Sequence, residues 1–158
     1  MPDDRTLAQF KADTYQQLVA PVQNVHSRRA LLWKVSDDME KRGAGIVIRY
    51  ITDAAISDRE HGESLRCEHM VPRSVILRRL ASQADFEITR PEVDRAIELF
   101  RHICYVTGAE RGYLDQNYEG WSAKTHMPPD WDYIAGDVDT RYHRVKQSEP
   151  GLTNWQLA

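Results

Sequence analysis

The chain has 158 residues, of which 41% are hydrophobic and 28% are charged, and its formal net charge is −3. This length is enough for one domain with its own core, and no apolar run approaches the ~20 residues of a membrane span. The first residues carry no pattern of a secretory signal, and the two cysteines are too few for a disulfide framework or a four-cysteine zinc site. We therefore expect a single soluble domain over residues 1–158, cytoplasmic and without a membrane partner.

The acidic charge balance bears on possible partners. Proteins that bind nucleic acid through phosphate contacts usually carry a basic surplus, so a pI near 6.1 argues mildly against DNA. The basic side chains could still gather on one local face of the domain. The members of such a face would be Arg28, Arg29, Arg73, Arg78, Arg79 and Lys124.

The first third of the sequence predicts two amphipathic helices. Apolar residues recur at spacings of three and four over residues 4–19 and again over residues 27–42. Thr6 or an early aspartate can cap the first helix, Pro21 ends it, and Gly43 ends the second. We interpret residues 1–43 as a helical scaffold.

The next stretch predicts strands around a polar loop. Residues 46–51 are β-branched and aromatic, as in a strand, and residues 57–64 form a polar loop. Residues 65–71 form a second short strand that ends near Glu68 and His69. Pro72 then interrupts the backbone, and a helix begins at Arg73.

Two capping-box patterns mark later helices. Thr89 and Glu92 begin a helix that reaches about Arg101, and Thr107 and Glu110 begin another that runs to about Tyr118. Between them, residues 102–106 alternate like a strand. After residue 120 the pattern fades: residues 127–133 are expected to be extended, residues 139–145 helical, and residues from 148 onward a tail. The segment 120–158 is therefore expected to be mostly irregular.

The pair Glu68-His69 is the first candidate for chemistry, because a carboxylate and an imidazole at a strand end can hold a metal ion beside a general base. If the strands at 65–71 and 102–106 pair, Cys67 and Cys104 lie near one another and the helix from Thr107 can pack across the pair. The expected fold class is then α+β, mostly helical, with a small β-hairpin and crossing helix over residues 65–118 that carries a helical insertion.

The residues Glu68-His69-Met70-Val71-Pro72 resemble the first motif of the HNH (His-Me finger, ββα-metal) endonucleases, an acid-histidine pair followed by proline. The resemblance implies that His69 is the general base that activates water and that Glu68 is a ligand of Mg²⁺ or Mn²⁺. Residues 102–107 are similar in pattern to the family's second motif, which implies that His102 supports His69.

The sequence departs from the family on the crossing helix. The third motif position of the family lies on this helix and is usually His or Asn. In this sequence it corresponds to Arg111, which cannot ligate a cation. Glu110 is already explained by its capping box, so Asp115 and Asn117 are the candidate further metal ligands beside Glu68, and His126 could approach from a loop.

Two functions compete, and the first is the one we expect. The first is a metal-dependent endonuclease that hydrolyses DNA, with Arg73, Arg78 and Arg79 as phosphate contacts. The second is a catalytically degenerate HNH-like domain that binds nucleic acid or a protein partner, which the acidic pI and Arg111 both favour. A plain helical interaction protein, in which Glu68 and His69 have no chemical role, is the third reading.

Overall fold

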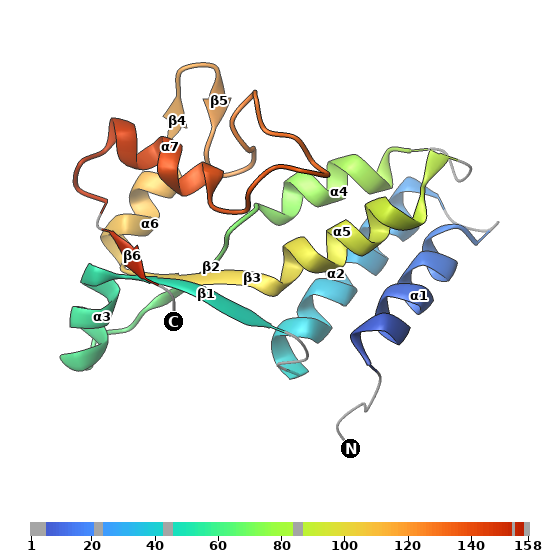
Figure 1. Cartoon of the computed structure of the whole chain (residues 1–158), viewed down its shortest axis with the longest axis horizontal. Helices are drawn as coiled ribbons and strands as arrows, with labels where there is room; N and C mark the ends of the chain where they lie inside the picture. Colours follow the sequence, from blue (N-terminus) through green and yellow to red (C-terminus); the bar gives the residue numbers. More distant parts are fainter. Residues whose placement is uncertain (1–5, 21–23, 43–45, 84–86, 153, 157–158) are drawn as a thin grey trace. The chain divides into compact units, whose positions relative to one another are not determined.

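The computed structural model describes residues 6–20, 24–42, 46–83, 87–152 and 154–156. Within these ranges the chain forms seven helices and six short strands, an α+β fold that is mostly helical, as predicted (Figure 1). Both Pro21 and Gly43, the expected ends of the first two helices, lie outside the described residues. No helix in the described ranges has the length and apolar character needed to cross a membrane.

The chain divides into two compact units, each made of two separate stretches. Unit 1 comprises Met1–Ile46 and Arg73–Arg101, and unit 2 comprises Val47–Pro72 and His102–Ala158. The predicted helical insertion between the two strands therefore belongs to the same unit as the N-terminal helices.

Unit 1 contains four helices: α1 (Leu7–Leu18), α2 (Val25–Arg42), α4 (Arg73–Ala81) and α5 (Arg90–Arg101). α1 packs on α5, α2 packs on α4, and α4 packs on α5. The predicted cap of α1 is confirmed, since the Gln9 N–H donates to Thr6 Oγ1 at 3.2 Å. The buried apolar side chains of unit 1 include Leu18, Leu32, Met39, Ile76, Leu80, Val93, Ile97 and Phe100.

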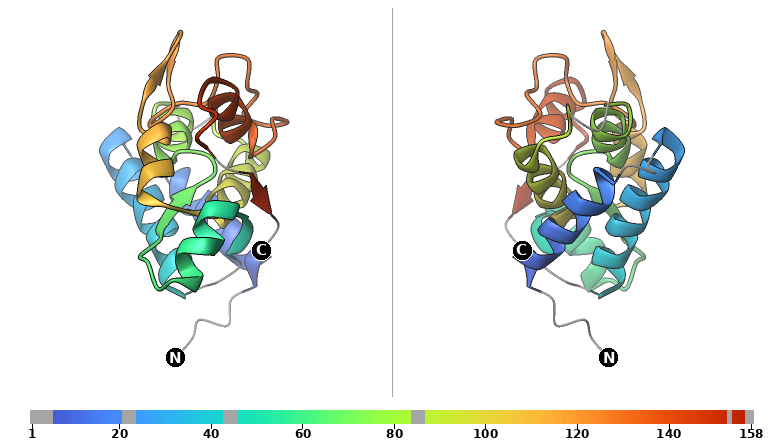
Figure 2. Two further views of the ribbon diagram at one scale, coloured as in Figure 1. Left: turned by 90° about the vertical axis from the view of Figure 1, so that its left-hand side faces the viewer. Right: turned by 90° about the vertical axis from the view of Figure 1, so that its right-hand side faces the viewer.

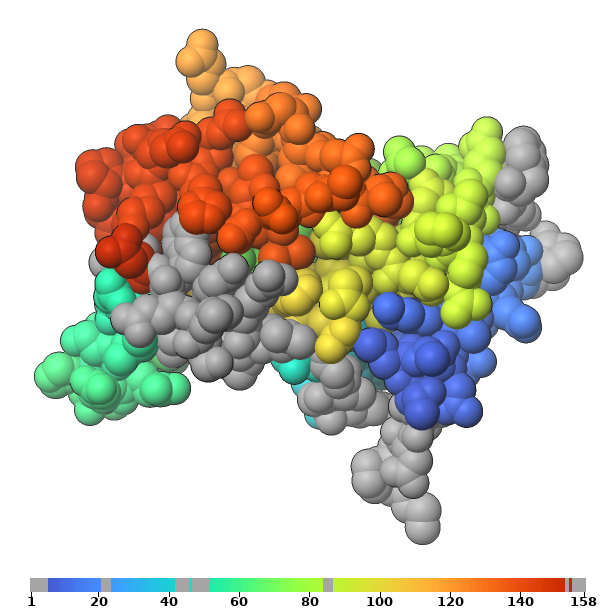
Figure 3. All heavy atoms as spheres, in the orientation of Figure 1, coloured from blue at the N-terminus to red at the C-terminus, as the bar shows by residue number. Residues whose placement is uncertain are grey.

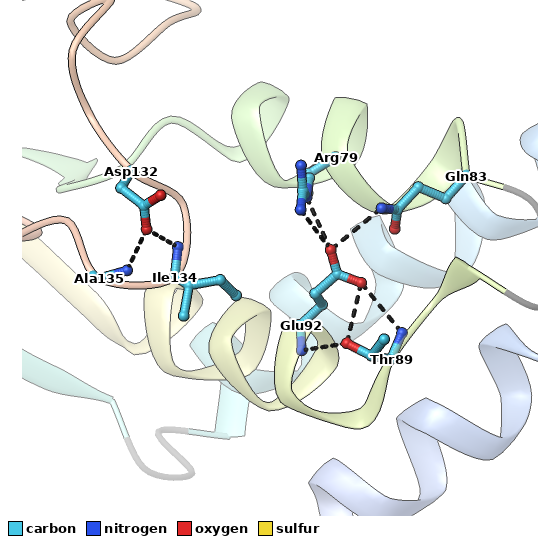
Figure 4. Close-up of polar contacts among 7 residues, drawn as sticks. All are labelled: Arg79, Gln83, Thr89, Glu92, Asp132, Ile134 and Ala135. Carbon is cyan, nitrogen blue, oxygen red and sulfur yellow. Dashed lines mark hydrogen bonds and ion pairs between the residues drawn. The ribbon is translucent and has the colours of Figure 1, made fainter.

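The start of α5 shows how a buried charge is stabilised in unit 1. The predicted capping box is present: Glu92 Oε2 accepts the Thr89 N–H at 3.2 Å (Figure 4). The other oxygen, Oε1, accepts hydrogen bonds from Arg79 at 2.7 Å and from Gln83 at 3.2 Å. Burial raises the pKa of Glu92, but the hydrogen bonds from Thr89, Gln83 and Arg79 outweigh it, so the pKa lies below the ordinary value.

Unit 2 is built on a four-stranded sheet with the order β2-β3-β1-β6. β3 (His102–Val106) lies between β2 (Arg66–His69), with which it is antiparallel, and β1 (Val47–Thr52), with which it is parallel. The register of β2 and β3 places Glu68 opposite Cys104 and Cys67 opposite Tyr105, so the predicted pairing of these two strands is confirmed. Burial raises the pKa of the Cys104 thiol to about 12, which keeps it protonated.

Two boundaries around the sheet differ from the prediction. Residues Asp53–Glu60 form helix α3, whereas Ser57 to Ser64 were expected to be a loop. The Ala55 N–H donates to Thr52 Oγ1 at 3.0 Å, and this cap at the end of β1 favours a helix over a loop. The expected C-terminal tail also contains β6 (Trp155–Gln156), which pairs antiparallel with β1.

The remaining elements of unit 2 follow β3. Helix α6 (Gly108–Leu114) is shorter than predicted, because Asp115 caps its end and the chain turns into a hairpin of β4 (Asn117–Tyr118) and β5 (Trp121–Ser122). Gly120 has a φ of 80°, a backbone conformation that glycine adopts without strain, at the hairpin turn. The hairpin projects from unit 2 (Figure 2).

The segment after the hairpin leads to α7 (Thr140–Ser148), close to the predicted last helix. Tyr133 is buried, and its ring contacts that of Trp131 edge to face, with 6.2 Å between the centroids. Asp132 Oδ1 accepts the Ile134 and Ala135 N–H groups at 2.9 and 2.6 Å, which closes a turn (Figure 4). In the space-filling view, this segment and α7 form a continuous surface of unit 2, in orange and red (Figure 3).

Candidate functional site

Glu68 and His69 lie at the end of β2, where the prediction placed them. His69 is the last residue of the strand and pairs with Ile103, and the next N–H, of Met70, donates to the His102 carbonyl at 3.0 Å. Consecutive side chains of a strand start on opposite faces, so Glu68 and His69 diverge along β2. The structure therefore confirms that the pair lies at the strand end, with the two side chains starting on opposite faces.

Two arginines engage the carboxylate of Glu68. Arg111 Nε, from α6, lies 2.9 Å from Oε1, and Arg141 Nη2, from α7, lies 3.5 Å from Oε2. The Glu68 side chain is 15% exposed, so most of this carboxylate is shielded from water. Arg111 is the residue that the sequence placed at the third motif position, and the structure brings it to Glu68.

The position of Arg111 follows from the start of α6. The Glu110 N–H donates to Thr107 Oγ1 at 3.1 Å, and the Thr107 N–H donates to Glu110 Oε2 at 3.0 Å, which completes the predicted capping box. Thr52 Oγ1, at the end of β1, also donates to Glu110 Oε2 at 2.7 Å. The first turn of α6 is thereby joined to the sheet, and the next residue, Arg111, is held over β2.

Arg141 is the site residue that the sequence analysis missed. Its side chain is 2% exposed, and Nη1 donates to the Ala123 carbonyl at 3.1 Å. Arg141 lies four residues before the buried Val145, on the inward side of α7, and a charged residue at such a position needs an acidic partner. That position is the signal that could have identified it. Burial raises the pKa of the neighbouring Tyr142, whose phenol therefore stays protonated.

Of the two residues expected to complete a metal site, Asp115 lies beside Arg111. Asp115 Oδ2 is 3.9 Å from Arg111 Nε and 3.9 Å from Lys124 Nζ. Asn117 is exposed at the start of β4, where it pairs with Ser122. In the described part of the chain, no three His, Cys, Asp or Glu side chains gather as a metal site would require.

The second candidate catalytic residue, His102, is the first residue of β3. It is 6% exposed, and its carbonyl accepts the Met70 N–H just after His69. Its backbone therefore holds the chain at the end of β2. The expected role of its side chain in supporting His69 stays a prediction.

The three arginines expected to contact DNA belong to α4, in unit 1. The Arg73 guanidinium lies 4.2 Å from the centroid of the Trp33 ring, and Nη1 is 2.9 Å from Asp37 Oδ1. Arg79 is bound to Glu92. Arg78 is exposed. Arg73 and Arg79 thus have acidic partners within their own unit, which reduces the charge they offer to a phosphate.

As arranged, the side chains around Glu68 do not fit a divalent cation. Both carboxylate oxygens already face guanidinium groups. At about 5 Å and an effective dielectric constant of about 20, the repulsion between a divalent cation and one guanidinium is on the order of 7 kcal/mol. The arrangement fits a carboxylate that orients arginines better than one that ligates a metal.

No protein-family model matches the chain, and no curated protein or solved structure shows significant similarity to it.

Proposed function

We propose that unit 2 is an HNH-like domain that binds DNA and hydrolyses its phosphodiester bonds. In this proposal β2, β3 and α6 form the two-stranded and helical site of that family, with His69 as the general base. The observation that carries the proposal is the antiparallel pairing of β2 with β3, together with α6, which follows β3 directly and contacts β2. Glu68 and His69 lie at the end of β2, beside these elements.

The proposed reaction needs a base and a positive charge at the phosphate. His69 accepts a proton from water, the water oxygen forms a bond to phosphorus, and the bond from phosphorus to the leaving oxygen breaks. The leaving oxygen takes a proton from solvent. A positioned base contributes about 10²–10⁴-fold to such a step.

The second candidate is an HNH-like domain that binds nucleic acid without cleaving it. The two arginines on Glu68 favour it, because they take up the carboxylate that would otherwise bind a cation. The expectation of Mg²⁺ or Mn²⁺ stays a prediction, and because both Glu68 oxygens face guanidinium groups, no step of the proposed reaction relies on a cation.

The test compares His69→Ala with His143→Ala, a control histidine on α7 whose side chain is 57% exposed. Binding and cleavage of fluorescent single- and double-stranded DNA are measured in Mg²⁺, in Mn²⁺ and in EDTA. We expect the wild type and His143→Ala to cleave, and His69→Ala to bind as tightly but to cleave at least about 100-fold more slowly.

Other results separate the candidates. Binding without cleavage by the wild type under all conditions supports the second candidate. Cleavage that is unchanged in His69→Ala contradicts the proposed base, and a wild type that binds no DNA contradicts both candidates.

A further inference from the structure

The Arg111 guanidinium contacts carboxylates through its Nε, whereas its two terminal amino groups are available to a ligand. Its Nε faces Glu68 at 2.9 Å and Asp115 at 3.9 Å, while its two terminal amino groups have no acceptor within the described ranges. The side chain is 46% exposed, so these groups reach solvent. A guanidinium fixed through Nε presents its remaining N–H groups as a fork, the geometry that matches two oxygens of a phosphate.

Glu68 is itself fixed from the inside of unit 2. Arg141, which is 2% exposed, faces the second oxygen of Glu68 at 3.5 Å and is anchored to the Ala123 carbonyl. Buried Arg141 therefore positions Glu68, and Glu68 positions Arg111. Because the carboxylate is held from both sides, Arg111 gives up less side-chain entropy on binding a ligand than an unrestrained arginine would.

The local charge favours an anion. The Lys124 side chain is 61% exposed, and its Nζ lies 3.9 Å from Asp115, next to Arg111 in this network. This network thus has three cations and two carboxylates, although the whole chain is acidic. The cations are Arg111, Arg141 and Lys124, and the carboxylates are those of Glu68 and Asp115. The open end of Arg111 and the Lys124 ammonium are the parts of this network that an approaching anion meets.

We infer that Arg111, oriented by Glu68 and Arg141, is a phosphate-binding residue that supplies the positive charge for which related sites would use a divalent cation. The ligand is a backbone phosphate of DNA, bound through the terminal amino groups of Arg111, with Lys124 adding a second charge. This inference rests on the proposed function of unit 2 and names the contact through which that unit holds its substrate.

The experiment uses the full chain and measures the affinity for a fluorescein-labelled DNA duplex by anisotropy. Arg111→Gln is compared with Arg144→Gln, a control arginine of the same unit that is similarly exposed, at 41%, and also paired with a carboxylate, Asp130. We expect Arg111→Gln to weaken binding about tenfold and Arg144→Gln to leave it within about twofold. Arg111→Lys, which keeps the charge but loses the fork, should recover only part of the loss. Circular dichroism confirms that each variant is folded.

The outcomes distinguish this inference from the proposed function. Wild-type binding of DNA that Arg111→Gln weakens no more than Arg144→Gln overturns the inference and leaves the proposed function standing. Binding of pyrophosphate that depends on Arg111, without binding of DNA, would show an anion site at Arg111, but it overturns both the proposed function and the inference that DNA phosphate is the ligand.

A second measurement addresses the cation directly. Calorimetric titration of the wild type with MnCl₂ should show no saturable binding at the Glu68 site. Saturable Mn²⁺ binding that is lost in Glu68→Gln would show that Glu68 is a metal ligand, and that result overturns the inference.

Discussion

Arg141 illustrates what a single buried charge requires of its surroundings. Its guanidinium faces the Glu68 carboxylate and donates to the Ala123 carbonyl, so most of its charge is met by oxygen atoms inside unit 2. Removing one partner of such a group leaves the other charge uncompensated, at a cost of about 3–5 kcal/mol. The integrity of the candidate site and the stability of unit 2 are therefore linked through this residue.

Glu92 provides a test of residue-scale electrostatics in unit 1. Because its pKa is lowered in the folded protein, its contribution to stability is complete above the unfolded value of 4.5 and is lost as the pH falls through the folded value. We expect Glu92→Gln to reduce the free energy of unfolding by about 1–3 kcal/mol at pH 7. In the variant, the free energy of unfolding should also fall less between pH 7 and acidic pH than it does in the wild type. Urea unfolding at pH 7 and at pH 3 to 4 measures both effects.

Asp94 provides the matched control. Its carboxylate pairs with Arg90 on the exposed side of α5. Asp94→Asn should change the free energy of unfolding by no more than about 0.5 kcal/mol, because exposed ion pairs contribute little. Equal effects of the two substitutions would contradict the role assigned to Glu92.

For single residues, the sequence predicts where a residue lies in the fold better than it predicts which side chain that residue contacts. Glu68 and His69 lie at a strand end as expected, because local β propensity and Pro72 define that end. Arg111 reaches the predicted place because the capping box of α6 sets the register of the helix. The contact of Glu68 with Arg141 joins residues far apart in the chain, and no local pattern specifies it.

Among the elements, α6 has the most to do with the site, since it carries Arg111 and is joined to β1 through Glu110. Thr107→Ala should cost about 1 kcal/mol, as is usual for the loss of a helix cap. Glu110→Ala should cost about 2–3 kcal/mol, because it also leaves the buried Thr52 hydroxyl without its acceptor. Urea unfolding of the two variants measures the difference.

The capping box of α1 is the natural control for this prediction. Thr6 and Gln9 make the same pair of local hydrogen bonds, but they are exposed. Gln9→Ala should therefore cost about 0.5 kcal/mol or less. If Gln9→Ala and Glu110→Ala are equally destabilising, the bond to Thr52 does not stabilise α6.

Elements with strong local signals were predictable, and elements that depend on partners were not. α5 and α6 begin at the capping boxes read from the sequence. β6 and the β4–β5 hairpin have only two residues in each strand, too few for a periodic pattern, and they form because neighbouring strands pair with them. The parallel pairing of β1 and β3 likewise depends on contacts between distant parts of the chain.

For the whole molecule, a net charge of −3 limits how DNA can be bound. If Arg111 and Lys124 are the phosphate contacts, the logarithm of the binding constant should fall with the logarithm of salt concentration with a slope of about −2. Anisotropy titrations between about 50 and 200 mM NaCl measure this slope. Arg111→Gln should reduce its magnitude by about one, and Arg78→Gln should leave it unchanged.

A slope of about −5 or steeper would require further phosphate contacts. The arginines of α4 would then be the first to test, because the sequence identified them as a basic face. A steep slope that Arg78→Gln reduces would restore the expected role of α4 in binding DNA.

The order of the strands also has a consequence for synthesis on the ribosome. β3 lies between β1 and β2 in the sheet, although it is made after both and after the helices α4 and α5. A nascent chain that ends before His102 therefore contains β1 and β2 without the strand that they share. During that interval the edges of β1 and β2 that β3 will cover are open to other chains, and the second edge of β1 is covered only when β6 has been made.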